Sequence, residues 1–129
     1  MPPVEQLQRV PIYHLAALER QGIFTTGLLL EVSETPTRRQ YLADQIGADI
    51  TDVIDWRDEA LLLNLANFGP QEQMLFTQAG IVGLDDLLAL PLDDFRFRLG
   101  RSARVLGVEP PTELISEGWW EQAHTLREE

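Results

Sequence analysis

The sequence contains no cysteine and no lysine, and it has only two histidines. The absence of cysteine excludes disulfides, thiolate ligands for zinc or iron–sulfur clusters, and a cysteine nucleophile. All ten basic residues are therefore arginines, whose planar guanidinium groups suit bidentate contacts with carboxylates or phosphates. A coding bias of the source genome is the simpler explanation for the missing lysine, so this absence alone does not indicate a ligand.

Positive charge is scarce, with 10 basic residues against 21 acidic ones and a formal net charge of −11. A field of this sign repels phosphate polymers and anionic membrane surfaces at long range. No segment approaches the roughly 18 consecutive apolar residues of a membrane span, and the opening MPPVEQLQRV lacks the basic and apolar regions of a signal peptide. We therefore expect a soluble, cytoplasmic chain with no membrane partner.

Helix signals run along the whole chain, because apolar residues recur at helical spacing between residues that start or end helices. Thr35 followed by Pro36 predicts a helix start, and Gly47 and Gly80 suit the left-handed residue that closes a helix. A kink or break is expected at Gly100. The predicted helices span residues 4–9, 11–21, 25–32, 36–46, 51–66, 70–79, 84–90, 92–106 and 112–127.

A helical hairpin occurs twice in the chain. Residues 65–88, LANFGPQEQMLFTQAGIVGLDDLL, combine a helix, a Gly-Ile turn and a second short helix, and residues 7–30 repeat that order. Gly80 therefore corresponds to Gly22. Repeats of this kind bury their apolar faces against their neighbours.

These patterns predict an all-α fold with no strand. We expect a single compact domain over residues 1–129, in which pseudo-repeat units at about 4–50 and 51–108 share one core. The helix predicted at 112–127 stands where a third unit would begin, and we expect it to cap that core.

The hairpin pattern, in which an apolar residue and a short turn precede a helix, Gly-Ile and Leu-Leu, resembles the helix-hairpin-helix motif. The tandem form, with Thr-Pro-Thr-Arg-Arg from Thr35 and Thr-Asp-Val-Ile-Asp-Trp from Thr51, resembles the bacterial domain of unknown function family 4332 over residues 4–106. The resemblance implies two helix-hairpin-helix (SAM-like) units related to nucleic-acid-binding modules. It implies no settled activity.

In helix-hairpin-helix proteins that bind DNA, the resemblance implies a Gly-x-Gly turn whose backbone N–H groups hold a phosphate. The first turn, residues 9–13, has no glycine, and the second has one glycine followed by Pro70, which lacks an N–H group. Glu72 adds a repelling charge behind the second turn. Nucleic-acid binding at this turn therefore stays an alternative, and the residues that would carry it are Asn67, Phe68, Gly69 and Gln71.

One stretch is locally basic. FRFRLGRSAR, residues 95–104, contains four arginines and no acid. On a helix, Arg98, Arg101 and Arg104 share the face opposite Phe95, Leu99 and Leu106, so this face suits an acidic partner segment or a phosphate backbone. A solvated face that balances nearby carboxylates is the plainer alternative.

Trp119 and Trp120 are adjacent, so on a helix their side chains point about 100° apart and cannot both face one core. An exposed ring would anchor a protein partner or a second copy of the chain. The alternative is that one ring packs inward while the other lies along the flank of the helix. The sequence leaves both alternatives open.

Catalytic patterns are scarce. His14 and His124 lie far apart, neither has a second ligand at helical spacing, and a single histidine more often lies at a surface or at a helix cap. We expect no enzymatic activity, no catalytic residue, no metal site and no cofactor. The sequence favours a non-catalytic protein–protein binding or scaffolding module, with DNA binding through the arginine face or the hairpin turns as the alternative.

Overall fold

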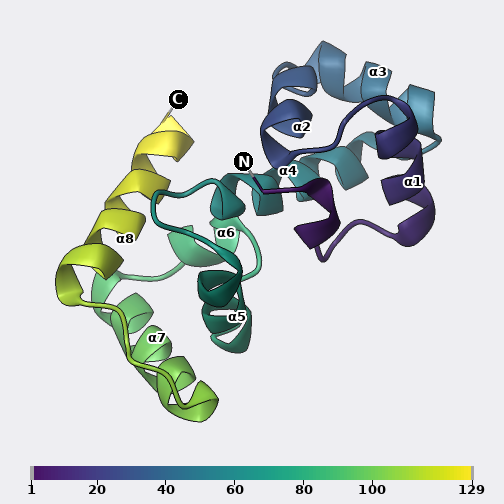
Figure 1. Ribbon diagram of the computed structural model, residues 1–129. Coiled ribbons are helices and arrows are strands. Elements are labelled where there is room, and N and C mark those ends of the chain that lie inside the picture. Colours follow the sequence, from purple (N-terminus) through teal and green to yellow (C-terminus); the bar gives the residue numbers. More distant parts are fainter. Residues whose placement is uncertain (1, 129) are drawn as a thin grey trace. The chain divides into compact units, whose positions relative to one another are not determined.

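The computed structural model describes residues 2–128, and this part of the chain forms eight α-helices and no strand (Figure 1). The all-α prediction is confirmed. The chain divides into two compact units, Met1–Asn64 and Leu65–Glu129. A short 3₁₀ turn, Val4–Gln6, opens the first unit.

Each unit contains four of the helices. The first unit contains α1 (Ile12–Arg20), α2 (Thr26–Val32), α3 (Pro36–Ile46) and α4 (Ile50–Leu63). The second unit contains α5 (Pro70–Gln78), α6 (Leu84–Leu88), α7 (Leu92–Leu106) and α8 (Glu113–Glu128). No helix in the described part of the chain has the length and the apolar composition that crossing a bilayer would take.

The first unit is organised around α4, which packs against α2 and α3. Trp56 of α4 is buried, as are Leu18 of α1 and Leu29 of α2. The Arg57 guanidinium of α4 also donates through Nη1 to the carbonyl oxygen of Leu30 at 2.9 Å. Apolar burial and this hydrogen bond together hold α2 to α4.

The second unit is organised around an aromatic cluster. Phe76 of α5 lies edge-on to Phe68, Phe95 and Trp119, with ring centroids 4.8, 5.6 and 5.2 Å away. Edge-to-face aromatic pairs contribute about 0.5–1.5 kcal/mol each beyond the burial of their area. Because Phe95 belongs to α7 and Trp119 to α8, the cluster joins three helices of this unit.

The two Gly-Ile turns have matching geometry. Gly22 and Gly80 adopt left-handed backbone conformations, with φ values of +81° and +80°. In both turns the N–H group of the following isoleucine donates to a carbonyl oxygen five residues earlier, at 3.0 Å in the first unit and 2.9 Å in the second. These bonds satisfy carbonyl groups that the helix end would otherwise leave without a donor. The two turns therefore share one backbone geometry, while the hairpin repeat as a whole stays a prediction.

Most helix starts lie where the sequence places them. Thr25 and Thr35 cap α2 and α3 by accepting a backbone N–H bond through their side-chain oxygens. α4, however, begins at Ile50, one residue earlier than expected. The Asp52 carboxylate accepts the N–H group of Asp49 at 3.1 Å, and this reciprocal cap places the helix start one residue earlier in the chain.

The prediction of a helix break at Gly100 is wrong, since α7 runs from Leu92 to Leu106 without interruption. Phe95, Leu99 and Ala103 are buried on the inner face of this helix. Their burial outweighs the cost of about 1 kcal/mol that glycine imposes on a helix interior.

The division of the chain differs from the predicted repeat boundaries at 4–50 and 51–108. α4, expected to open the second unit, packs within the first, because its apolar face is covered by α2 and α3. α8, expected at 112–127, packs against α6 and α7 within the second unit. A single domain with one shared core stays a prediction.

Gly100 within α7 and Gly107, which caps the C-terminal end of that helix, give a matched test. We expect Gly100→Ala to raise the free energy of unfolding by about 0.5–1 kcal/mol, because it removes a helix-interior glycine. A Cβ at this position would meet nothing within 4 Å. A Cβ at Gly107 also meets nothing, but its φ is +69°, so Gly107→Ala should lower that free energy by about 1–2 kcal/mol. Urea unfolding followed by far-ultraviolet circular dichroism measures both, and shifts of the same sign would contradict these helix assignments.

Candidate functional site

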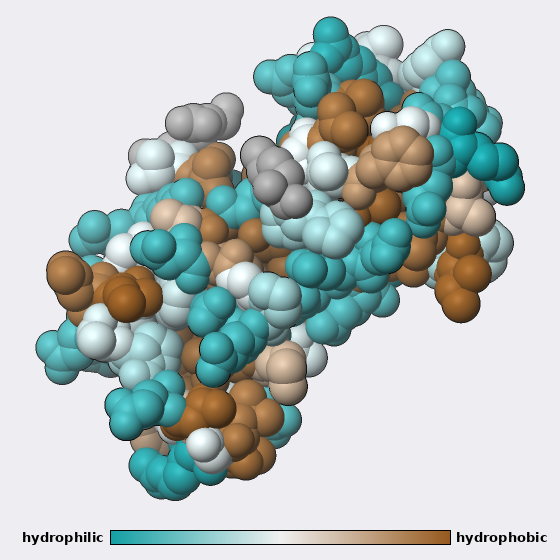
Figure 2. Space-filling view, viewed as in Figure 1, coloured by the Kyte–Doolittle hydropathy of each residue, from teal (hydrophilic) through white to brown (hydrophobic). Residues whose placement is uncertain are grey.

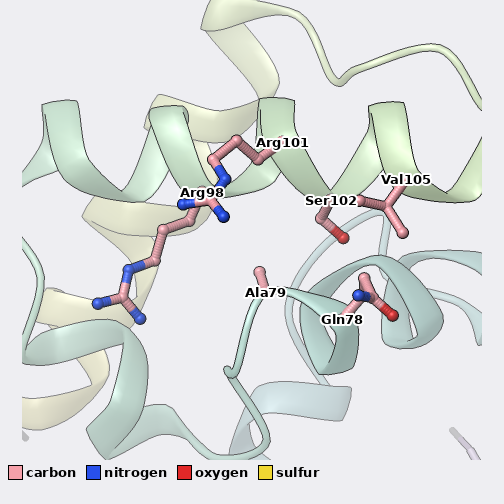
Figure 3. A pocket seen from close by; sticks show the side chains of 6 residues that line it. All are labelled: Gln78, Ala79, Arg98, Arg101, Ser102 and Val105. Carbon is pink, nitrogen blue, oxygen red and sulfur yellow. The ribbon is translucent and has the colours of Figure 1, made fainter.

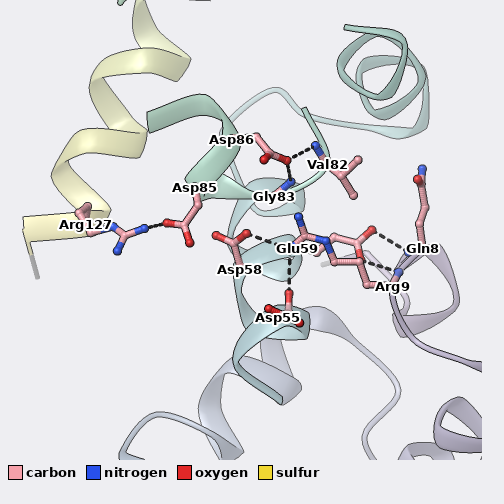
Figure 4. Close-up of polar contacts among 10 residues, drawn as sticks. All are labelled: Gln8, Arg9, Asp55, Asp58, Glu59, Val82, Gly83, Asp85, Asp86 and Arg127. Atoms are coloured by element: carbon pink, nitrogen blue, oxygen red, sulfur yellow. Dashed lines mark hydrogen bonds and ion pairs between the residues drawn. The ribbon is translucent and has the colours of Figure 1, made fainter. Parts of the chain in front are cut away.

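The chain at the entry to the first hairpin turn, at Gln8 and Arg9, already holds an anionic group, the carboxylate of Glu59 from α4. The N–H groups of Gln8 and Arg9 donate to its two oxygens at 2.6 and 2.9 Å (Figure 4). Glu59 is only 1% exposed. Successive N–H groups of a turn are the donors that would hold a phosphate, so an incoming phosphate would have to displace this buried carboxylate.

The Arg9 side chain adds two further contacts between the start of the chain and α4. Its Nη1 atom lies 2.9 Å from a carboxylate oxygen of Asp58 and donates to the carbonyl oxygen of Asp55 at 3.1 Å. Burial raises the pKa of the Glu59 carboxyl above its usual value of 4.5, while the N–H bonds from Gln8 and Arg9 oppose that shift. Glu59 therefore connects the start of the first unit to α4.

The second hairpin turn is occupied in a similar way. Glu72, expected to repel an approaching phosphate, accepts the N–H group of Gly69 at 2.9 Å. Phe68 is half-buried and packs against Phe76 in the aromatic cluster, so its ring is engaged within the second unit. Of the four residues predicted to contact nucleic acid at this turn, the two side chains left exposed are those of Asn67 and Gln71. Asn67 adopts a left-handed backbone conformation with φ +59°.

The turn after α5 repeats the pattern once more. The N–H groups of Val82 and Gly83 donate to one carboxylate oxygen of Asp86, at 2.9 and 3.2 Å (Figure 4). The chain's own carboxylates therefore accept backbone N–H groups at the turns of both units. Sequence reasoning missed Glu59, although a signal was present: it lies three residues after Trp56, within an apolar stripe.

The three arginines predicted to share a face do so on α7. Arg98, Arg101 and Arg104 are all exposed, and Phe95 and Leu99 on the opposite side are buried. The ion pairs found among residues 2–128 involve other arginines. This face therefore keeps its positive charge.

A concave site lies beside this face. Its volume is about 250 Å³, and its walls come from the last turn of α5 and from α7 (Figure 3). The lining residues are Gln78, Ala79, Arg98, Arg101, Ser102 and Val105. Figure 3 shows Arg98 and Arg101 reaching from α7 in the same direction. Sequence reasoning found these two arginines but could not connect them with α5.

The two adjacent tryptophans have different surroundings. Trp119 is buried, and its Nε1 donates to the carbonyl oxygen of Ala66 at 2.7 Å. Trp120 is half-buried, and its Nε1 donates to the carbonyl oxygen of Leu90 at 3.0 Å. The alternative in which one ring packs inward while the other lies on the flank describes this geometry. Both rings therefore tie α8 to its own unit.

The surface or capping position expected for a single histidine is wrong for His14. Its ring is buried in the first unit, with its centroid 4.3 Å from that of Tyr13 and 5.2 Å from that of Trp56. His124 stacks on Trp120 in the second unit at 4.0 Å. Among residues 2–128, no group of three or more His, Cys, Asp or Glu side chains is arranged to hold a metal ion.

Residues 13–126 match the family model described as a domain of unknown function, DUF4332. The chain belongs to this family. No curated protein and no solved structure matches it. The resemblance noted over residues 4–106 is confirmed at the level of the family, and the DUF4332 match extends further to include most of α8. The family description names no activity, so a function for this DUF4332 chain has to be argued from its surfaces.

The buried carboxylate of the first turn can be tested by removing it. We expect Glu59→Leu to lower the free energy of unfolding by about 1–3 kcal/mol, because the N–H groups of Gln8 and Arg9 lose their acceptor. Glu72→Leu is the matched control. Glu72 is half-buried and accepts one N–H group, so about 1 kcal/mol or less is expected. Urea unfolding measures both, and equal losses would contradict the special role of Glu59.

The pH dependence of stability supplies a second test of the same group. Because burial raises the pKa of Glu59, the folded chain keeps this proton to higher pH than the unfolded chain. Above pH 4.5 the folded state thus binds more protons, and stability falls as pH rises through the raised pKa. We expect the free energy of unfolding of the wild type to fall over this window relative to that of Glu59→Gln, which cannot titrate there. A difference that stays constant with pH would contradict the raised pKa.

Proposed function

We propose that the chain is a non-catalytic protein-binding or scaffolding module. The observation that carries this proposal is the set of large apolar side chains that both units leave exposed. Ile12 at the start of α1 is 85% exposed and Leu114 in the first turn of α8 is 81% exposed. Figure 2 shows apolar side chains at the surface where α7 ends and α8 begins, among hydrophilic ones. Exposed apolar patches rimmed by polar residues are typical of protein interaction sites.

The occupied hairpin turns support protein over nucleic acid as the partner. A phosphate held by a helix-hairpin-helix turn needs backbone N–H donors, and Glu59 and Glu72 already accept such donors in the two turns. The net charge of −11 adds long-range repulsion against a polyanion. Both arguments favour a protein over a nucleic acid as the partner.

DNA binding is kept as the second candidate because of one observation, the arginine face of α7. The ion pairs found among the described residues do not involve Arg98, Arg101 or Arg104 of that face. Phosphate contacts strengthen steeply as salt falls, so a titration at low salt is the most favourable condition for this candidate.

Site-specific photocrosslinking in the native cells tests the proposal. We expect a benzophenone side chain at Leu114 or at Ile12 to give adducts with one or a few proteins, because these exposed apolar positions would lie within an interface. The same group at the exposed polar residue Gln40 is the control and should give markedly fewer adducts. Nuclease treatment should leave the adducts unchanged.

DNA titration completes the test. Single- and double-stranded oligonucleotides should not bind the purified chain even at about 50 mM salt. Binding under these conditions, or adducts that disappear on nuclease treatment, would favour the nucleic-acid candidate instead.

A further inference from the structure

Four arginines and no acid lie within residues 95–104 of α7, in a chain with about twice as many acids as bases. Two arginines of the second unit reach acids. Arg96, one of the four on α7, lies 3.3 Å from Glu117, and Arg127 of α8 forms an ion pair with Asp85. No described carboxylate lies within ion-pair distance of Arg98 or Arg101. Arg20, Arg39 and Arg57 also form no ion pair among the described residues, so what distinguishes Arg98 and Arg101 is that both line one concave site. Two guanidinium groups at one concave site suit an anion from outside the chain.

The concave site between α5 and α7, called here the arginine pocket, is lined by both of these arginines (Figure 3). No Asp or Glu lines it. Arg98 also lies close to the turn after α5, since a Cβ on Gly80 would be 3.9 Å from its Nη1. The C-terminal end of α5 contributes roughly half a negative charge, against two full positive charges from the arginines. The pocket therefore remains positive.

Apolar side chains flank the pocket on the same helix. Phe97 is 64% exposed and Val105 is 68% exposed. At about 100° per residue, these two residues and the three arginines occupy an arc of roughly 120° on α7. The Cζ atom of Arg101 lies 5.9 Å from the ring centroid of Phe97, a distance typical of a cation–π contact. The face thus offers positive charge and apolar area side by side.

The size of the pocket and the charge of the chain limit what can occupy it. Its volume of about 250 Å³ lies below the roughly 300–1,000 Å³ of pockets that enclose small-molecule ligands. One side chain of a partner is a better match. A nucleic acid carries a phosphate charge about every 1.7 Å of duplex and would be repelled by the net charge of −11, whereas a short peptide segment carries few charges.

We propose that the arginine pocket binds an aspartate or glutamate side chain of a protein partner, while an apolar residue next to it packs on Phe97 and Val105. Arg98 and Arg101 hold the carboxylate, and Arg104 extends the positive face by one turn. This inference rests on the proposed protein-binding function and specifies the chemistry of the segment that is bound.

A displayed library of random peptides, each of about twelve residues, tests the proposal with the full chain as bait. Peptides enriched on the wild type should contain Asp or Glu beside Leu, Ile or Phe. Replacing those acids by Asn or Gln should weaken binding by at least about tenfold, because charge-assisted bidentate bonds to arginine are lost. Raising the salt concentration should weaken binding as well.

Two double variants separate the pocket from the overall charge. Arg98→Ala with Arg101→Ala should weaken binding of the enriched peptides by at least about tenfold. Arg20→Ala with Arg38→Ala is the control, because it removes the same charge from exposed arginines of α1 and α3. It should change binding by less than about twofold. Circular dichroism confirms that both variants fold.

The outcomes distinguish this inference from the function on which it rests. Enriched peptides without acids, or with equal affinity for both double variants, would overturn the arginine pocket while leaving a protein-binding function in place. Failure to enrich any peptide would also overturn the pocket, and the photocrosslinking result then decides the broader function separately. DNA that binds the wild type but not the Arg98→Ala, Arg101→Ala variant would overturn both, since the pocket would then take phosphate.

Discussion

Backbone N–H groups at turns and helix starts need acceptors, and this chain supplies them largely from its own carboxylates. Glu59 accepts two such groups in the first unit, and Asp86 accepts two in the second. Asp52 and Glu72 each accept one at a helix start. A buried or half-buried donor without an acceptor would cost about 1–3 kcal/mol. The hairpin turns and the helix starts therefore depend on these acids as acceptors of backbone N–H groups.

The same requirement shapes what the surface can do. Part of the acidic excess is committed to turns, where a helix-hairpin-helix protein that binds DNA would present donors to a phosphate. Three exposed arginines, Arg98, Arg101 and Arg104, instead share one face of α7, beside exposed Phe97 and Val105. The binding face that we propose therefore lies on the side of a helix and not on a hairpin turn, and it combines charge with apolar area as protein interfaces do.

Much of the fold could be predicted because helix boundaries are set by local chemistry. Two predictions were correct: the helix start at Thr35-Pro36 and the left-handed glycines at the Gly-Ile turns. Each of these features depends on neighbouring residues only. The helix break predicted at Gly100 was wrong, because a helix can accommodate an interior glycine when its inner face is buried. That burial depends on residues far away in the sequence. The surface or capping position predicted for His14 was wrong for a related reason, because an aromatic ring from α4 packs against the His14 ring.

The sequence by itself determined the helical class, the positions of most turns, the family and the arginine face of α7, because helical period and turn chemistry are properties of short segments. Only the tertiary structure decided which turn amides were already bound, since Glu59 lies about fifty residues from the N–H groups that it accepts. The tertiary structure also decided that Arg98 and Arg101 share a pocket with the end of α5. Neither contact could be read from spacing, because both depend on how helices distant in sequence pack within their unit.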